Sequence, residues 1–291
     1  MGKRRDLRDG LLFIFPYAVI WLLFLFGPLV FGFIMSLHKW DPLRENVFVG
    51  FKNYIEIFQT ARFWNSFGVT WKFVAMTIPG IVIVALGTAL ILHFISFKGS
   101  SLFESVFFFP YLLNVSIVSI IWALLNDPDI GIISKALKAL GMKNPAILAN
   151  KGFVLPMIAI ATVWWLAGYR MIVFRAALSS IPQDIYDAAK IDGSGPVRTF
   201  FAVTLPLLKP TMLFTLVLTA VGGMRTFGQV ILMTSGGPGT SSEVLALYMY
   251  RQGFEFLNFG KAAAVGFVLF LLIFLLSIIF VKIFKLEGDL R

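Results

Sequence analysis

The polar residues that could contact another molecule are concentrated in one insert, Ile181 to Pro210, which lies between two long apolar runs. At about 100° per residue, the insert begins as an amphipathic helix. Its polar arc carries Gln183, Asp184, Asp187 and Lys190. Its apolar arc carries Ile181, Ile185, Ala188 and Ala189. Charges on one face of a short helix suit docking to a partner outside the membrane, and the alternative is an ordinary solvated loop.

Prolines and a glycine set the ends of this helix. Pro182 suits the first helical position, and Gly193 suits the residue just past the end, where a left-handed backbone favours glycine. Pro196 stands where a second helix can begin, and Pro206 and Pro210 mark the entry to the next apolar run. The sequence therefore predicts a helix over 182–193 that ends abruptly.

The insert resembles the cytoplasmic signature of inner-membrane subunits of binding-protein-dependent ABC importers. That signature begins Glu-Ala-Ala-x-x-x-Gly and ends Ile-x-Leu-Pro. This chain has Asp187-Ala188-Ala189, Gly193 and then Val203-Thr204-Leu205-Pro206. Asp187 replaces the usual Glu and Val203 the usual Ile, so the charge and the apolar character are kept.

Other segments extend the resemblance over nearly the whole chain. The LLFIFPY opening after a basic cluster, the run FVGFKNYIEIF, and SGGPGTSSEVLALYMYRQGF followed by GKAAAVGFVLF look like carbohydrate-type permeases of the maltose and glycerol-phosphate kind. The resemblance implies one half of a translocation pore for a sugar or related solute. Residues 182–193 would then form a coupling helix that fits a groove in a cytoplasmic ATPase subunit.

The same resemblance implies the partners and the coupling residues. The partners are a second homologous permease, two ATPase subunits and an extracytoplasmic solute-binding protein, with ATP and magnesium on the ATPase subunits and no cofactor on this chain. Asp187 and Lys190 are expected as polar contacts, and Gly193 as the turn. The full set of expected coupling positions is Tyr186, Asp187, Ala188, Ala189, Lys190, Asp192, Gly193, Leu205 and Pro206.

Composition indicates a membrane protein independently of any family. Hydrophobic residues make up 58% and charged residues 14% of 291 residues, with a mean hydropathy of +0.86, so polar side chains are too few to cover a water-soluble globule. Six runs are long enough to cross a hydrocarbon layer as helices. They lie at roughly 11–38, 68–95, 104–125, 153–178, 205–229 and 261–284. We expect an all-α integral membrane protein with one permease domain, 1–291.

The basic residues indicate how the chain is oriented. Lys3, Arg4, Arg5 and Arg8 precede the first run, which favours a cytoplasmic start. The total charge count is nearly even, because the loop at about 126–152 is also lysine-rich. From the N-terminal cluster and the resemblance we predict a multi-pass protein of a bacterial or archaeal cytoplasmic membrane, with both termini inside. The net charge of +10 is explained by lipid headgroups without a nucleic-acid partner.

The sequence offers few groups for catalysis. His38 and His93 lie at span ends far apart in the sequence, and no spacing suits a metal site. Ser235-Gly236-Gly237-Pro238 lacks the lysine of a phosphate-binding loop and favours a tight turn. We therefore expect a transport subunit without its own nucleotide site, and an integral-membrane enzyme is disfavoured.

Polar and aromatic residues within or beside the runs are candidates for the solute path. These candidates are Asn114, Trp164, Tyr169, Arg225 and Gln229. Helix-to-helix hydrogen bonding and interfacial anchoring of tryptophan are the alternative uses of such groups. An ion-coupled secondary transporter is the alternative function, although it normally places a carboxylate deep in the membrane and most acidic residues here fall in expected loops.

Single cysteines test the predicted orientation, because the chain has none of its own. With an inside start, the Ser194→Cys variant is expected to resist an impermeant thiol reagent added to intact cells, whereas Ser241→Cys is expected to react. The measurement is labelling of each variant. Reversed labelling would overturn the orientation and, with it, a meeting between the 182–193 helix and a cytoplasmic ATPase.

Overall fold

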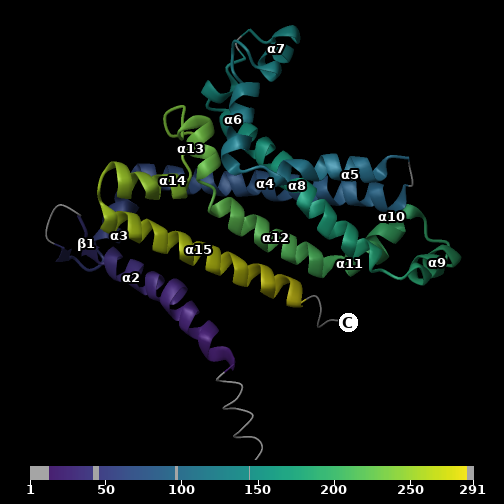
Figure 1. Cartoon of the computed structure of the whole chain (residues 1–291), viewed down its shortest axis with the longest axis horizontal. Helices are drawn as coiled ribbons and strands as arrows, with labels where there is room; N and C mark the ends of the chain where they lie inside the picture. Colours follow the sequence, from purple (N-terminus) through teal and green to yellow (C-terminus); the bar gives the residue numbers. More distant parts are fainter. Residues whose placement is uncertain (1–12, 42–45, 96–97, 144, 287–291) are drawn as a thin grey trace, which may run out of the picture. The chain divides into compact units, whose positions relative to one another are not determined.

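The fold is built almost entirely from helices (Figure 1). The computed structural model describes residues 13–41, 46–95, 98–143 and 145–286, so the basic cluster from Lys3 to Arg8 lies outside the described residues. The elements in chain order are η1 (Leu22–Phe26), α2 (Gly27–Ser36), β1 (His38–Lys39), β2 (Val47–Phe48), α3 (Lys52–Gln59), α4 (Ala61–Phe94), α5 (Ser100–Phe108), η2 (Phe109–Leu112), α6 (Val115–Leu125), α7 (Ile132–Ala139), η3 (Ile147–Ala149), α8 (Val154–Ser179), α9 (Gln183–Ile191), α10 (Pro196–Thr199), η4 (Phe200–Thr204), α11 (Leu205–Leu207), α12 (Lys209–Met224), α13 (Gly228–Thr234), α14 (Leu245–Tyr250), η5 (Arg251–Glu255) and α15 (Phe259–Leu286).

Four helices of the described chain are long and apolar enough to cross a membrane. They are Phe13–Ser36, Ala61–Phe94, Val154–Ser179 and Phe259–Ile283. Two bent helix pairs raise the number to six if each pair is one span. These pairs are Ser100–Leu112 with Val115–Leu125 and Pro196–Leu207 with Lys209–Met224. The chain is thus an all-α membrane protein with four to six spans, at the places where the sequence predicts six.

The prediction that the third and fifth runs are continuous helices is wrong. The third pair bends by 102° and the fifth by 68°. Pro110 cannot donate a backbone hydrogen bond, and Asn114 adopts an extended backbone before α6 begins. The fifth helix also ends at Met224, so that Gln229 belongs to the separate helix α13 rather than to the end of a span.

Proline acts in two different ways within these helices. A π-helical turn ends just before Pro28, and another ends just before Pro206, and both turns widen the helix ahead of the proline ring. The helix is therefore locally opened ahead of Pro28 and Pro206. By contrast, α4 continues through Pro79 from Ala61 to Phe94 without a break.

The described residues form two compact units, which are considered separately. Unit 1 comprises residues up to 61 and residues 249–270. In it, strands β1 and β2 pair antiparallel after α2, and α3 follows. The buried Asn53 amide nitrogen donates to the carbonyl oxygens of Ser36 (2.7 Å) and His38 (2.9 Å), which joins α3 to the end of α2.

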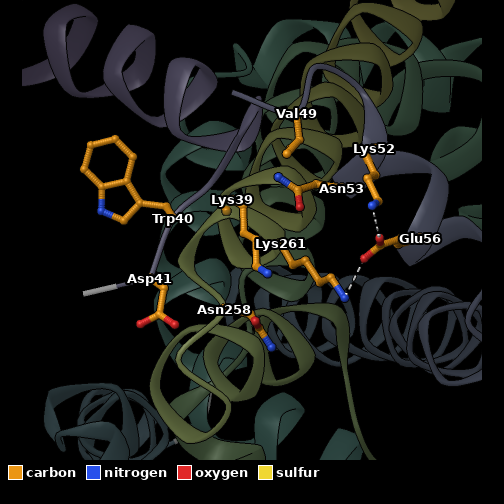
Figure 2. A pocket seen from close by; sticks show the side chains of 10 residues that line it. Lys39, Trp40, Asp41, Val49, Lys52, Asn53, Glu56, Asn258 and Lys261 are labelled. Carbon is orange, nitrogen blue, oxygen red and sulfur yellow. Dashed lines mark ion pairs between the residues drawn. The ribbon is translucent and has the colours of Figure 1, made fainter. Parts of the chain in front are cut away.

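Glu56 connects α3 to the start of α15 within unit 1. Its carboxylate lies 2.7 Å from the Lys261 ammonium and 3.9 Å from that of Lys52, as Figure 2 shows. The hydrogen bond from Lys261 is the main cause that holds the pKa of Glu56 below its ordinary value. Gly260 lies directly beside the His38 carbonyl, where a Cβ atom would collide.

Unit 2 comprises residues 62–248 and 271 onward, and its core lies between α4 and α8. Ala85, Ala89 and Leu92 of α4 are buried in one cluster with Met171, Phe174 and Leu178 of α8. Helices α5 and α13 also pack on α8, and α13 packs on α6. Figure 1 shows α6 turned away from α5, and α9 at the end of this unit remote from α13.

A buried ion pair fixes the start of α4. Arg62 donates two hydrogen bonds to Glu243, of 2.7 and 2.8 Å, and the Glu243 side chain is fully buried. Asn65 also donates to the Thr240 carbonyl oxygen at 2.8 Å. Helix α4 begins at Ala61, seven residues before the apolar run that the sequence predicts from residue 68. Its first turns carry Arg62 and Asn65, which bind the loop that contains Glu243.

Gly168 is predicted to be essential to the packing of α8 against the broken third span. A Cβ atom there would collide with the Phe107 carbonyl oxygen, so Gly168→Ala is expected to cost about 1–3 kcal/mol. Gly222→Ala is the matched control, because this glycine lies in α12 with no atom within 4 Å of the added Cβ. Thermal unfolding in detergent measures both variants. An equal midpoint for Gly168→Ala and wild type would contradict this role.

The Glu56 ion pair is predicted to make stability depend on pH. Because the folded pKa is lowered, the pair stabilises the protein above the ordinary value of 4.5, and this stabilisation is lost as pH falls through the folded pKa. Glu56→Gln is therefore expected to lower the thermal midpoint at pH 7 by an amount worth about 1 kcal/mol or less, and to match wild type in acid. Lys261→Met should behave alike, whereas Lys52→Met, which loses a longer and more exposed contact, should change little. A pH-independent difference would contradict the ionic explanation.

Candidate functional site

The amphipathic helix of the polar insert is present as α9, and it ends as predicted. Gly193 has φ +73°, the Ser194 N–H donates to the Ala189 carbonyl (2.9 Å), and the Gly193 N–H donates to the Lys190 carbonyl (3.0 Å). These two bonds form a Schellman motif, which needs a left-handed residue where Gly193 stands. At the other end, Pro182 is the N-cap rather than the first helical residue, which corrects its predicted place by one position.

The buried face of α9 differs from the predicted apolar arc. Tyr186 and Ala189 are buried, whereas Ile185 and Ala188 are exposed. The Tyr186 ring meets the Phe94 ring edge-on at 5.6 Å, and its hydroxyl lies 3.5 Å from the Thr204 hydroxyl. Tyr186 therefore holds α9 against the end of α4 and against η4.

The predicted polar arc of α9 is exposed and carries its own contacts. The Asp187 carboxylate lies 3.5 Å from the Lys190 ammonium and accepts a hydrogen bond of 3.3 Å from the Gln183 amide. The side chains of Asp187 and Lys190 are 55% and 70% exposed, so an exposed pair of this kind contributes little to stability. Both charges remain accessible to another molecule.

Apolar side chains around α9 are exposed to an unusual degree for a segment outside the long spans. Ile191 is 88% and Val197 is 72% exposed, and Ile185 and Phe201 are exposed as well. An open groove of about 840 Å³ runs beside them, lined by His93 and Phe94 of α4, Tyr186 of α9 and residues from 194 to 204. Apolar groups that are exposed together in this way mark an interaction surface.

The end of the signature, Leu205-Pro206, lies in α11. A π-helical turn over Phe200–Thr204 precedes it, and the N–H of Leu205 donates to the carbonyl of Phe200. Leu208, directly after α11, is fully buried in the core between α4 and α8. The expected coupling positions Leu205 and Pro206 thus link the insert to the core and lie apart from the exposed arc of α9.

The break in the third span brings several path candidates toward α8. Asn114 caps α6, since its side-chain oxygen accepts from the Ser116 N–H at 3.0 Å. The Trp165 indole N–H donates to the Leu113 carbonyl oxygen at 3.1 Å. Trp164 is 40% exposed and meets Trp122 of α6 edge-on at 6.0 Å. The break is thus lined by aromatic groups and stabilised by side-chain hydrogen bonds.

Tyr169 lies about three turns before the end of α8 and stacks on Tyr111 of η2. The two rings are 4.6 Å apart and nearly parallel, and the Arg170 guanidinium lies 5.1 Å from the centre of the Tyr169 ring. Tyr111 and Arg170 are functional candidates that the sequence interpretation missed. Only the break in the third span brings Tyr111 to Tyr169, and the sequence gives no signal for that break beyond Pro110.

The last two path candidates separate in the structure. Gln229 is buried on α13, its side-chain oxygen accepts from the Thr162 hydroxyl at 2.7 Å, and its amide nitrogen has no partner among the described residues. It therefore shares the α6, α8 and α13 region with Asn114 and Trp164. Arg225 is exposed at the end of α12 and does not join this group.

A second, polar pocket of about 260 Å³ lies within unit 1 (Figure 2). The Glu56 carboxylate and the Lys39, Lys52 and Lys261 ammonium groups line it, together with Trp40 and other residues. Figure 2 shows the Glu56 carboxylate between Lys52 and Lys261, with Asp41 and Asn258 farther along the wall. Asn53, Glu56, Gly260 and Lys261 all come from the FVGFKNYIEIF and GKAAAVGFVLF runs.

Comparisons with known proteins agree with this architecture. The chain is 34% identical to the sn-glycerol-3-phosphate transport system permease protein UgpA of Yersinia pestis bv. Antiqua, over 92% of this chain and 91% of that protein. It is 31% identical to the trehalose/maltose transport system permease protein MalF of Thermococcus litoralis, over 99% and 97% of the two chains. The crystal structure of a bacterial alginate ABC transporter, in complex with an alginate pentasaccharide-bound periplasmic protein, contains a chain of the same fold. The TM-score is 0.81 at 21% identity, with 95% of this chain and 94% of that chain covered.

Residues 58–285 match the family model of the binding-protein-dependent transport system inner membrane component. The match includes α4 to α13, and with them the polar insert, the broken third span and the loop that carries Glu243. Nothing in these comparisons supports the alternative of an ion-coupled transporter. The chain belongs to the family of inner-membrane components of binding-protein-dependent transport systems and is a permease subunit of an ABC importer.

Proposed function

We propose that this chain forms one half of the translocation pore of an ATP-driven importer for a sugar or a related polyol. The observation that carries the proposal is the family match over residues 58–285, together with an exposed α9 between the fourth and fifth spans. The named relatives support the solute class, because their names refer to glycerol 3-phosphate, trehalose and maltose. The whole of 1–291 would act as a single permease domain.

We assign α9 to docking on a separate ATPase subunit. The exposed Asp187 and Lys190 would supply polar contacts, and the exposed Ile191 beside them would supply apolar area. Tyr186 and Ala189 would hold α9 in place from its buried side, and Gly193 would end it. The remaining expected positions, Ala188, Asp192, Leu205 and Pro206, would shape or support this surface.

The partners that we propose are a second homologous permease, two ATPase subunits and a solute-binding protein. The alginate transporter, crystallised with its periplasmic binding protein, supports the last of these by analogy of fold. ATP and magnesium would be held by the ATPase subunits, so that this chain would contribute no catalytic group. In this arrangement both termini and α9 would lie on the cytoplasmic side of a bacterial or archaeal inner membrane.

The solute path would lie along the broken third span. Asn114, Trp164 and Tyr169 are near this break, and Gln229 reaches the same helices through Thr162. The aromatic rings offer faces for a sugar, and the unpaired Gln229 amide offers a donor. Arg225 lies at the end of α12, outside this group, and we propose no role for it in the solute path.

Gly193→Val is the variant that tests this function. A β-branched residue with φ +73° is strained, so the variant is expected to distort the end of α9 and to lower solute-stimulated ATPase activity at least tenfold. Gly195→Val is the matched control, because Gly195 has φ −73° and no atom within 4 Å of an added Cβ. Membrane insertion of both variants should be normal.

Two measurements on the assembly purified from native membranes make the test decisive. An ATPase subunit is expected to co-purify with wild type and with Gly195→Val, and less of it with Gly193→Val. Full coupling in Gly193→Val would remove α9 from the docking surface. Solute uptake by this chain alone, driven by an ion gradient and without a co-purifying ATPase, would replace the proposed function with the ion-coupled alternative.

A further inference from the structure

Arg170 is a cation within a membrane-spanning helix. Helix α8 has 26 residues, and a rise of 1.5 Å per residue puts Arg170 about 5 Å from its middle. The hydrocarbon layer is about 30 Å thick, so the Arg170 backbone lies inside it. An arginine at this depth costs about 2.5–3.5 kcal/mol on insertion scales, which makes contact with acyl chains unfavourable.

One nitrogen of the Arg170 guanidinium lacks a hydrogen-bond partner among the described residues. Its Nη1 atom is fully buried and has no hydrogen-bond acceptor among the described residues. The Arg170 guanidinium carbon lies over the face of the Tyr169 ring, 5.1 Å from the ring centre. Arg175, five residues later on α8, instead forms an ion pair with Glu104 of α5. Within the described part of the chain, α8 thus carries one arginine paired with a carboxylate, Arg175, and one without such a pair, Arg170.

Arg170 lies beside a pair of stacked aromatic rings near the break of the third span. Tyr169 stacks on Tyr111, which lies at the break of the third span. Gly168 lets the backbone of Phe107 and Phe108 approach α8 closely, and this approach keeps the stacked rings beside the guanidinium. The orphaned N–H points to an acceptor that the described residues do not supply.

We propose that Arg170 binds the anionic group of the transported solute, a phosphate, sulfonate or carboxylate carried on a sugar or polyol. This inference rests on the proposed function and narrows its solute class. Arginine suits such groups because its planar fork donates two parallel hydrogen bonds to one oxyanion. The stacked Tyr169 and Tyr111 rings would contact the carbon skeleton. Arg170 is then a specificity-determining residue of the pore, because the hydroxyl groups of a neutral solute accept weaker hydrogen bonds from its Nη1 than an oxyanion does.

The first experiment asks whether Arg170 faces a path that anions can enter. Arg170→Cys and the control Ile83→Cys are made in the cysteine-free chain and assembled with the partner permease, the ATPase and the binding protein. Ile83 is 70% exposed in the transmembrane helix α4 and is expected to face lipid. Negatively charged methanethiosulfonate ethylsulfonate is expected to modify Arg170→Cys at least tenfold faster than Ile83→Cys, as measured by the mass of this subunit. Equal rates, or no modification of Arg170→Cys, would overturn the proposal.

The second experiment compares the uptake of charged and neutral solutes. Glycerol 3-phosphate, glucuronate and maltose are supplied to the complete transporter carrying wild-type Arg170, Arg170→Lys or Arg170→Gln. Uptake of an anionic solute is expected to fall at least tenfold in Arg170→Gln and to be partly kept in Arg170→Lys, without loss of maltose uptake. Wild-type uptake of maltose alone, or an equal loss for all three solutes, would contradict the inference.

These outcomes are separable from failure of the proposed function. The ATPase is expected to co-purify with every Arg170 variant, because Arg170 lies within the long helix α8 and is not one of the proposed docking residues of α9. Loss of the ATPase from wild type would remove the proposed function itself. Loss of assembly only in Arg170→Gln would instead indicate that Arg170 pairs with a carboxylate of the partner permease, and this would also overturn an anionic solute as its ligand.

Discussion

A helix in hydrocarbon has no water to satisfy free backbone groups, so every break in a span needs a partner from the protein itself. The break in the third span shows how this chain meets the requirement. The Trp165 indole bonds the Leu113 carbonyl, and the Asn114 side chain bonds the Ser116 N–H. Both partners are polar groups of aromatic or amide side chains, which are also the groups that recognise a solute. Asn114, one of the residues that satisfy the backbone at the break, is therefore also among those to which we assign the proposed solute path.

The same constraint explains why segments distant in sequence are joined by charged and polar groups at the helix ends. Arg62 at the start of α4 binds the buried Glu243, and in unit 1 Lys261 at the start of α15 binds Glu56. A buried carboxylate without a partner would be strongly unfavourable, so Arg62 and Glu243 depend on each other. These pairs hold loops against the spans that follow or precede them. These pairs also explain why the FVGFKNYIEIF, SGGPGTSSEV and GKAAAVGF runs contain charged residues. The runs supply one or both residues of each ion pair.

Hydropathy was sufficient to predict the spans but not their interruptions. The apolar runs correspond to the four long helices and the two bent pairs, because burial in lipid is decided by composition over about 20 residues. The 102° bend occurs where Pro110 and Asn114 interrupt the helix, and the Trp165 indole, 51 residues after Asn114, bonds the freed Leu113 carbonyl. A window average over about 20 residues cannot detect single residues of this kind. Likewise, the Gly193 turn was predictable from local backbone preference, whereas the burial of Tyr186 depends on Phe94 in another helix. Tyr111 was missed for the same reason, whereas Arg170 could have been found from the sequence as a charged residue within the apolar run 153–178.

Helix α8 connects the two regions to which function is assigned. Tyr169 and Arg170 lie in its membrane portion, and only residues 180–182 separate its last residue from α9. The connection is short and hydrogen-bonded, since the Ser180 N–H bonds the Ala176 and Ala177 carbonyls and the Ile181 N–H bonds that of Leu178. Tyr186 adds a second attachment from α9 to the end of α4, which packs along α8 in the core of unit 2. Because packed helices shift between discrete arrangements rather than deform continuously, a displacement of α9 must pass into α4 and α8 together. In the function that we propose, α9 held at two points in this way would move the walls of the solute path without a flexible joint between them.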